Sequence, residues 1–222
     1  MGIGYKEVIP LLNSLQKFQG KKDLRLCELG NNYMKGLEME NWFRMNDFNF
    51  PVGGEQHNTG VVSKRFWDEI GFIHTSIDLN GLDGSLKLDL REDISEHFEE
   101  KFDIIYDGGT AEHVENQYMC FKNIHNITKN NGLMIHVLPK TGHFPKHCQY
   151  YYTTKSFEVL SEKCNYEVIE LFEHLADGGT MIYATLQKND NDFISKEDFD
   201  DVPIDFVDEF SHDKSLYPYA YK

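Results

Sequence analysis

Four carboxylates stand at or near the ends of short apolar runs of the kind that form buried strands. They are Glu28 in "LRLCELG", Asp78 in "FIHTSIDLNG", Asp89 in "SLKLDL" and Asp107 in "KFDIIYDGG". The carboxyl ends of parallel strands meet at one rim of an open α/β sheet, where ligands bind. A single acid in such a place is more often a turn or cap residue, but four along one rim predict a ligand site. These carboxylates would accept hydrogen bonds from hydroxyl or amino groups of that ligand.

Two histidines lie in the loop "PKTGHFPKHCQYYY" (139–152), after another apolar run, "LMIHVLP" (133–139). This loop is expected at the same rim as the acids. An imidazole with its ordinary pKa of about 6.5 can remove a proton at neutral pH. We therefore predict His143 or His147 as a general base, and favour His143 because it is nearer the strand end. With His136 and Cys148, these histidines are expected to be polar loop residues rather than metal ligands, so no metal is predicted, and a metal-assisted reaction is the minor alternative.

Strands and helices alternate along the chain. Apolar runs predict strands at 23–30, 72–81, 85–90, 101–109, 133–139, 166–175 and 180–187, and helical spacing predicts helices at 1–22, 112–129 and 153–165. Such alternation indicates a parallel sheet covered by helices on both faces, in which the last two runs could pair as an antiparallel hairpin. The segment 31–71 is longer than one turn and helix require. Its "FPVGGEQHNTG" predicts an insertion, and we interpret it as a lid.

Composition excludes several classes of protein. The 222 residues fit one domain, and a net charge of -15 would repel a nucleic-acid backbone. No apolar run approaches the roughly 20 residues that span a bilayer, and the N-terminal segment does not resemble a signal peptide. Four widely separated cysteines predict reduced thiols and a cytoplasmic protein. The acidic segment 189–222 is interpreted as a solvated or loosely docked tail, with a partner-binding segment as the alternative.

The chain from Leu24 to Leu186 resembles the class I S-adenosylmethionine-dependent methyltransferases, in particular the small-molecule group typified by the methyltransferase type 11 domain. The most specific part is "FDIIYDGGTAEHVENQYMCFKNIHNITKNNGLMIHV" (102–137), with its Phe-Asp-apolar-apolar strand, Glu-His-apolar motif, helix, glycine turn and next strand. The resemblance implies a Rossmann-like, doubly wound, mostly parallel seven-stranded sheet with an antiparallel last strand. It also implies a methyltransferase domain over 1–188 and S-adenosyl-L-methionine as the cofactor.

The resemblance assigns roles to the residues of the rim. Gly30 is similar to the first glycine of the cofactor loop, where a missing side chain lets the backbone approach the methionine part. Glu28 is similar to the acid that binds the cofactor's ammonium end, directly or through water. The sequence departs from the family at Asn31 and Asn32, which replace the usual glycines. Asn is the residue next best suited to a positive φ, so the turn is expected to survive, with Asn31 at the cofactor.

Further cofactor contacts are implied at the ends of the following strands. Asp78, with Leu79 beside it, resembles the acid that accepts both ribose hydroxyls, and Asp89 with Leu90 resembles the site of the adenine amino group. Asp107 and Gly108 would lie beside the methionine moiety and the transferring methyl group. His113 of the Glu-His-Val motif is interpreted as structural, orienting the helix that follows.

The resemblance implies methyl transfer to oxygen or nitrogen of a small molecule or sugar, and the sequence indicates no particular oligomeric state. One alternative is a methyltransferase fold that has lost its cofactor and acts as a binding subunit. Another is an NAD(P)-dependent oxidoreductase, whose fingerprint requires Gly-x-Gly-x-x-Gly with an acid about 20 residues further on. Here there is one glycine, and Asp78 lies 50 residues after Glu28. That alternative is therefore less favoured.

Overall fold

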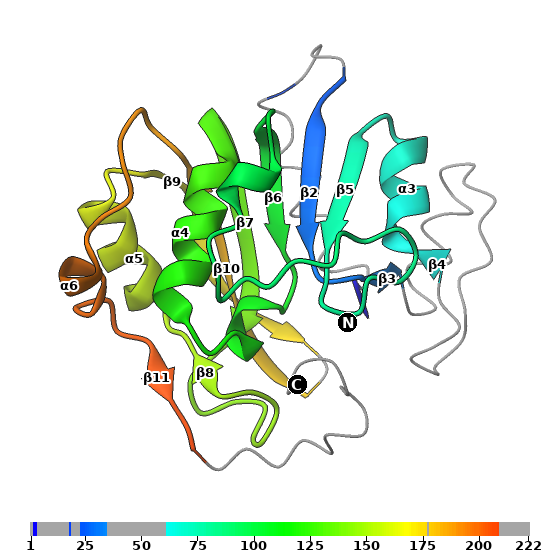
Figure 1. The fold of residues 1–222 in the computed structure, drawn as a ribbon. Helices are drawn as coiled ribbons and strands as arrows, with labels where there is room; N and C mark the ends of the chain where they lie inside the picture. The colour runs from blue at the N-terminus through cyan, green and yellow to red at the C-terminus, as the bar shows by residue number, and fades with distance from the viewer. Residues whose placement is uncertain (1, 4–17, 19–22, 35–60, 177, 209–222) are drawn as a thin grey trace.

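A six-stranded sheet forms the centre of the computed structural model, which describes residues 2–3, 18, 23–34, 61–176 and 178–208 (Figure 1). Its strand order is β5-β2-β6-β7-β10-β9. The strands are β5 Ile73–Ile77, β2 Arg25–Leu29, β6 Phe102–Asp107, β7 Thr128–Pro139, β10 Gly179–Gln187 and β9 Glu167–Ala176. The first four run parallel, and β10 is antiparallel to both of its neighbours. The predicted parallel sheet and its C-terminal hairpin are confirmed.

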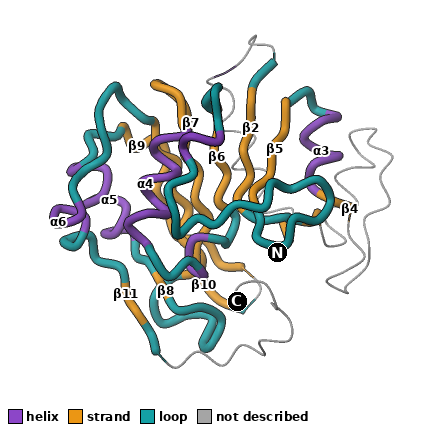
Figure 2. Tube along the Cα trace, viewed as in Figure 1, coloured by secondary structure: helices purple, strands orange, loops and turns teal. Residues whose placement is uncertain are grey.

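Helices cover both faces of this sheet. They are α3 Ser63–Glu69, α4 Gln117–Ile127, α5 Thr154–Lys163 and the short α6 Lys196–Phe199. Successive side chains of a strand point to opposite faces. On β2, Leu26 accordingly joins the cluster with Trp67 of α3, whereas Cys27 joins the cluster with Phe121 of α4 and Phe157 of α5. Figure 2 shows α4 and α5 in front of the sheet and α3 beside β5. The doubly wound architecture is therefore confirmed.

The predicted strand at 85–90 does not form, so the sheet has six strands where seven were expected. Leu86 makes one isolated parallel bridge to Ile77 at the end of β5. The Leu88 N–H then donates to the carbonyl of Leu86, two residues back, so it has no neighbouring strand as its partner. The Asp89 side chain next accepts from the Arg91 N–H and starts a turn. The alternating leucines resemble a strand, but this backbone bonds locally.

The segment predicted as one helix at 112–129 is divided. A 3-10 turn, η3, spans Ala111–His113, and α4 begins only after Asn116, whose side chain caps it by accepting from the Met119 N–H. The helix ends at Ile127, and β7 follows at once. The helix predicted at 153–165 is confirmed as α5, and Thr153 and Ser156 form a capping box at its start.

Short elements lie beside the main sheet. A three-stranded sheet joins β1 Gly2–Ile3, β3 Tyr33–Met34 and β4 Val61–Val62, and β8 Tyr150–Tyr151 pairs with β11 Asp205–Phe206. A further 3-10 turn, η2, spans Ser95–His97. Gly2–Ile3 is a strand within the predicted helix 1–22, most of which lies outside the described residues. The centre of the predicted insertion, 35–60, also lies outside them.

The described part of the acidic tail packs onto the domain. Phe199 of α6 and Val202 are buried in the same cluster as Phe121 of α4, and Phe193 packs against that cluster. Residues 189–208 are therefore continuous with the core, and 209–222 lie outside the described residues. Within the described part of the chain, no helix has the length and apolar character needed to cross a membrane.

Candidate functional site at the carboxyl ends of the strands

The turn after β2 is built on a glycine. Gly30 has φ +86°, a conformation that residues with a side chain rarely adopt, and its N–H donates to the carbonyl of Ile77 in β5. A Cβ added at Gly30 would lie 2.7 Å from Oγ1 of Thr110. The expectation of a positive φ at the following asparagines is wrong, because neither Asn31 nor Asn32 adopts one. The turn needs one left-handed residue, and Gly30 supplies it.

Asp78 lies just beyond the end of β5 and holds the β2 turn. Its two carboxylate oxygens accept from the backbone N–H groups of Asn31, at 2.7 Å, and Asn80, at 2.8 Å. The Asn31 side chain in turn donates to Asp83 at 2.7 Å. Each carboxylate oxygen can accept a further hydrogen bond, and Asp78 and the neighbouring Leu79 are only partly buried. The structure thus brings Gly30, Asn31, Asp78 and Leu79 together.

Glu28 is fully buried on the face of the sheet that α3 covers. Its carboxylate accepts from Ser63 and Asn32 and lies 3.0 Å from Nε2 of His74. These side chains occupy the oxygens that the sequence assigns to a cofactor ammonium group. Asn32 is also buried, and its Oδ1 has no hydrogen-bond partner among the described residues. This amide oxygen is therefore a buried acceptor next to Glu28 whose hydrogen-bonding capacity the described residues do not use.

Asp107 ends β6 and organises the turn that follows. It is fully buried, with one oxygen 3.0 Å from Nδ1 of His136 and the other accepting from the N–H groups of Thr110 and Ala111 at 3.1 Å. Thr110 donates to the carbonyl of Leu29, which joins this turn to the β2 turn. His136 is buried on β7 and not in a loop, which corrects the expectation for that residue.

Gly108 follows Asp107 in the same turn. A Cβ there would lie 2.6 Å from the ring of Tyr106. The turn therefore excludes any side chain at this position. Gly108 and Asp107 stand beside the Gly30 turn, where the sequence places them.

Asp89 and Leu90 belong to a different set of contacts. Arg91 binds both oxygens of Asp89, through Nε at 3.0 Å and Nη2 at 2.6 Å. Hydrogen bonds from Arg91 and its positive charge lower the pKa of Asp89. Leu90 is buried in the hydrophobic core. Asp89 is thus engaged by its own arginine, where the sequence assigns it an adenine contact.

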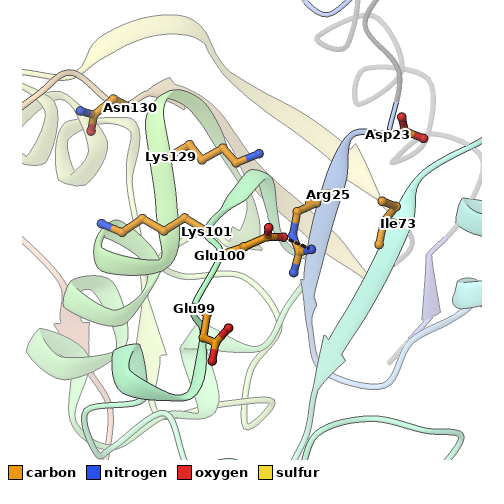
Figure 3. Close-up of a pocket in the computed structure, with 8 residues that line it drawn as sticks. All are labelled: Asp23, Arg25, Ile73, Glu99, Glu100, Lys101, Lys129 and Asn130. Carbon is orange, nitrogen blue, oxygen red and sulfur yellow. Dashed lines mark hydrogen bonds and ion pairs between the residues drawn. The ribbon is translucent and has the colours of Figure 1, made fainter.

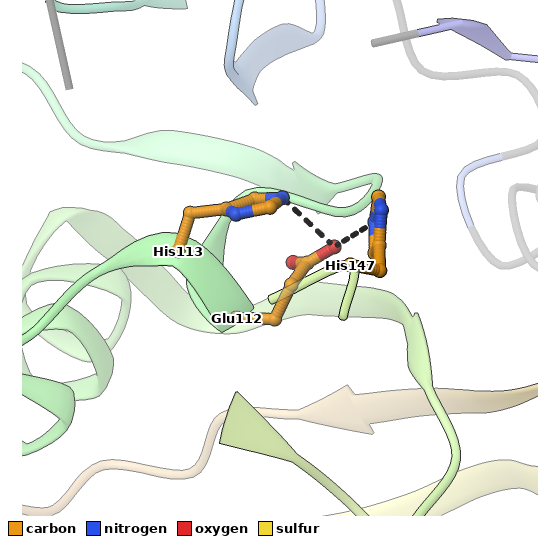
Figure 4. Close-up of side chains that lie close together, drawn as sticks. All are labelled: Glu112, His113 and His147. Carbon is orange, nitrogen blue, oxygen red and sulfur yellow. Dashed lines mark ion pairs between the residues drawn. The ribbon is translucent and has the colours of Figure 1, made fainter. Parts of the chain in front are cut away.

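The two loop histidines separate in the structure. Nδ1 of His143 accepts from the Thr180 N–H at 3.1 Å, at the start of β10. His147 instead faces Glu112 of η3, with its Nε2 3.7 Å from Oε1 of the carboxylate (Figure 4). His113 lies on the other side of Glu112, also with Nε2 3.7 Å from Oε1.

Glu112 is a residue to which the sequence assigns no role. It is fully buried, and neither carboxylate oxygen has a hydrogen-bond partner among the described residues. Burial raises its pKa to about 7, and the negative charge of Asp107 acts in the same direction, while His147 opposes both. The adjacent Glu and His in "AEHV" were the available signal, but the sequence does not show that His147 returns to them.

A hollow at the opposite rim is separate from this site (Figure 3). It lies at the amino ends of β2, β5, β6 and β7, and Arg25 within it forms a 2.6 Å ion pair with Glu100. It is lined by Asp23, Arg25, Ile73, Glu99, Glu100, Lys101, Lys129 and Asn130. Because ligands of such sheets bind at the carboxyl ends, we take the turns at Gly30 and Asp107 as the candidate site.

Neither a protein-family model nor a curated protein sequence matches this chain. Solved structures do match it. The 1,6-didemethyltoxoflavin-N1-methyltransferase of Burkholderia thailandensis, with bound 1,6-didemethyltoxoflavin and S-adenosylhomocysteine, has a TM-score of 0.52 at 12% identity, covering 82% of this chain and 78% of that chain. The N-methyltransferase NodS of Bradyrhizobium japonicum matches with a TM-score of 0.44 at 8% identity, covering 83% of this chain and 88% of that chain. A SAM-dependent methyltransferase of Aquifex aeolicus matches with a TM-score of 0.40 at 12% identity, covering 79% of this chain and 88% of that chain.

The Burkholderia match identifies the architecture. At 12% identity, it shows a shared fold and nothing finer. The fold of this chain is that of the class I S-adenosylmethionine-dependent methyltransferases, as the sequence resemblance predicts.

Proposed function

We propose that this protein is an S-adenosylmethionine-dependent methyltransferase that acts on oxygen or nitrogen of a small molecule. The observation that carries the proposal is the contact between the Gly30 turn and Asp78. The turn follows β2 and Asp78 follows β5, so both lie at the carboxyl ends of adjacent strands in this fold. The glycine lets the chain turn in a left-handed conformation at the end of β2, with Thr110 packed where a side chain would lie. The Asp78 carboxylate supplies hydrogen-bond acceptors beside this turn.

The residues of the rim fit such a cofactor. Asp78 would accept the ribose hydroxyls, and the β2 turn from Gly30 to Asn32 would hold the methionine part, with Asn32 Oδ1 as an acceptor for the ammonium group. Asp107 and Gly108 would line the same part through the turn that Asp107 holds. The cofactor supplies a methyl group already activated by its sulfonium, and the protein supplies alignment and exclusion of water.

Of the two loop histidines, His147 is the one we place at the acceptor. The hydrogen bond from Thr180 uses the lone pair of His143 at Nδ1, so a neutral His143 carries its proton on Nε2 and cannot remove another there. His147 points to the buried Glu112 beside the Asp107 turn. We therefore transfer the preference for a catalytic histidine from His143 to His147.

A cofactor-free binding subunit is the second candidate function. One observation favours it. The Glu28 carboxylate is hydrogen-bonded by Ser63, Asn32 and His74, so it does not present an oxygen to a ligand. Binding of the cofactor distinguishes the two candidates, since the subunit would bind none.

Calorimetric titration with S-adenosylhomocysteine tests the proposal. The wild type should bind it and not NAD⁺, and Asp78→Ala should weaken binding about 10- to 100-fold, because hydrogen bonds to a charged acceptor contribute about 1.5–3 kcal/mol. The control is Asp83→Ala, which also loses a contact to Asn31 but removes no predicted cofactor ligand. Absence of binding to the wild type would favour the cofactor-free subunit. Equal affinity in both variants would contradict the assigned place of the ribose.

A further inference from the structure

Three side chains that coordinate metals in other proteins converge beside the Asp107 turn. They are Glu112 and His113 of η3 and His147 of the loop before β8. Their ligand atoms all lie within 4.8 Å of one another, and both histidine Nε2 atoms lie 3.7 Å from Oε1 of Glu112. Figure 4 shows the two rings directed at the carboxylate from opposite sides. The cluster therefore combines two imidazoles with one carboxylate.

Glu112 has no evident structural role in this arrangement. Its side chain is fully buried, yet its oxygens accept no hydrogen bond from the described residues. Burying a carboxylate is costly unless a hydrogen bond, a counter-charge or a metal ion compensates it. The nearby Asp107 is a second buried acid, so the local need is for positive charge. A bound cation would meet that need.

The backbone that carries these residues is held in place. The Gln117 side chain donates to the carbonyls of Ala111 and Val114, on either side of Glu112 and His113, and is itself bonded by the hydroxyl of Tyr152. The loop that carries His147 is closed by the hydroxyl of Tyr151, which donates to the carbonyl of Phe144. The backbone on either side of the three side chains is thus held by groups other than the side chains themselves.

We propose that Glu112, His113 and His147 bind a divalent transition-metal ion of the zinc type. Two histidines and one glutamate are a common ligand set of zinc sites that keep a position open, whereas magnesium and calcium prefer oxygen ligands. Bonds of about 2.0–2.2 Å place tetrahedral ligand atoms about 3.3 Å apart, so each imidazole must approach Oε1 by a few tenths of an ångström from 3.7 Å. The ligand atoms of the two imidazoles lie within 4.8 Å of each other, so the two rings must also move together on binding. The side chains of His113 and His147 are 19% and 33% exposed, but Nε2 of His113 is itself buried, so the ion would enter from the side of His147.

The test is metal binding by the full-length, untagged protein after treatment with a chelator. Calorimetry with Zn²⁺ should show one tight site, and Co²⁺ should give the visible absorption of a low-coordinate complex. His147→Ala and His113→Ala should each weaken Zn²⁺ binding by about 100-fold or more, since each removes a ligand. His143→Ala is the matched control, because His143 lies in the same loop and its Nδ1 is bonded to Thr180. Its affinity for Zn²⁺ should equal that of the wild type.

Two results would overturn the proposal: absence of stoichiometric Zn²⁺ binding to the wild type, or equal affinity in the wild type and in both ligand variants. Circular dichroism of the metal-free variants checks that each is folded. His147 lies in a loop and is partly exposed, so its variant keeps the test valid if substitution of the buried Glu112 impairs folding. The proposal concerns metal binding, and in the metal-bound site His147 would be a ligand rather than the base at the acceptor. Its failure would leave the proposed methyl transfer unaffected.

Discussion

Gly30 meets two separate requirements, one in its backbone and one in the space around it. Its φ of +86° disfavours any other residue, and a Cβ would lie 2.7 Å from Oγ1 of Thr110. We expect Gly30→Ala to lower the free energy of unfolding by about 1–3 kcal/mol, and to weaken cofactor binding because the turn must shift. Urea denaturation measures the first effect, and titration with S-adenosylhomocysteine measures the second.

A double-mutant cycle separates the two requirements. Thr110→Ala removes the Oγ1 that the new Cβ would meet, together with its hydrogen bond to Leu29. Adding Gly30→Ala to that background should cost less than it does in the wild type, because the backbone strain remains while the clash is gone. Equal costs in the two backgrounds would show that φ alone excludes a side chain here.

Single residues of the site differ in how far the sequence reveals them. Gly30 and Asp78 could be predicted, because each follows an apolar strand and strand ends share a rim. The occupation of Glu28 by Ser63 and His74 could not be, since both come from distant parts of the chain. The same holds for Glu112 and His147. Burial and long-range contact decide these roles, and neither is visible in local spacing.

The C-terminal end of α4 depends on a neutral histidine. His125 is buried; its Nε2 donates to the carbonyl of Asn191 at 2.9 Å, and its Nδ1 lies 2.7 Å from the hydroxyl of Tyr166, which donates to it. Burial, aided by the positive charge of Lys188, lowers the pKa of His125 to about 4. The imidazole thereby joins α4 to the start of the tail, provided it stays unprotonated.

Acid should therefore weaken this junction. The ordinary pKa of His125 is 6.5, so between pH 6.5 and about 4 the unfolded chain binds a proton that the folded chain does not. Stability contributed by neutral His125 is complete above pH 6.5 and falls as the pH drops. We expect it to decrease by about 2 kcal/mol between pH 7 and pH 5.

Urea denaturation at both pH values measures this loss. The His125→Gln variant should lack that part of the pH dependence, because glutamine does not titrate. The control is His97→Gln, which changes an exposed histidine and should keep the wild-type pH dependence. A His125→Gln variant whose stability falls with pH as steeply as that of the wild type would refute this account.

Elements were predictable where the pattern and the hydrogen bonding agree. The strands β2, β5 and β6 and the hairpin of β9 and β10 all follow runs that the sequence marks. The run at 85–90 has the same alternation, but it lies at the edge of the sheet. Leu86 bonds to Ser76 and Asp78, after which the Leu88 N–H donates back to Leu86 and the Arg91 N–H to the Asp89 side chain. The alternation of side chains does not determine which carbonyl accepts the hydrogen bond of a backbone N–H. The predicted seventh strand was wrong for that reason.

At the scale of the whole molecule, the parallel sheet covered on both faces followed from the alternation of strands and helices, but the place of the acidic tail did not. Composition suggests a solvated segment, because acids dominate 189–208. Its apolar residues Phe193, Phe199 and Val202 lie between acidic residues, and they nevertheless pack on the cluster around α4. The tail closes the same face of the sheet that α4 and α5 cover. Its described part is thus needed to complete the core.

Two phenylalanines of the tail make a matched test of this conclusion. Phe199 is 5% exposed and packs its ring against Phe121, Tyr118 and Phe193, whereas Phe206 is 57% exposed and packs against Tyr150. We expect Phe199→Ala to lower the free energy of unfolding by about 3–4 kcal/mol, the cost of removing a buried ring, and Phe206→Ala by less than about 1 kcal/mol. Urea denaturation followed by circular dichroism compares the two variants with the wild type. If Phe199→Ala loses no more stability than Phe206→Ala, the tail does not contribute to the core.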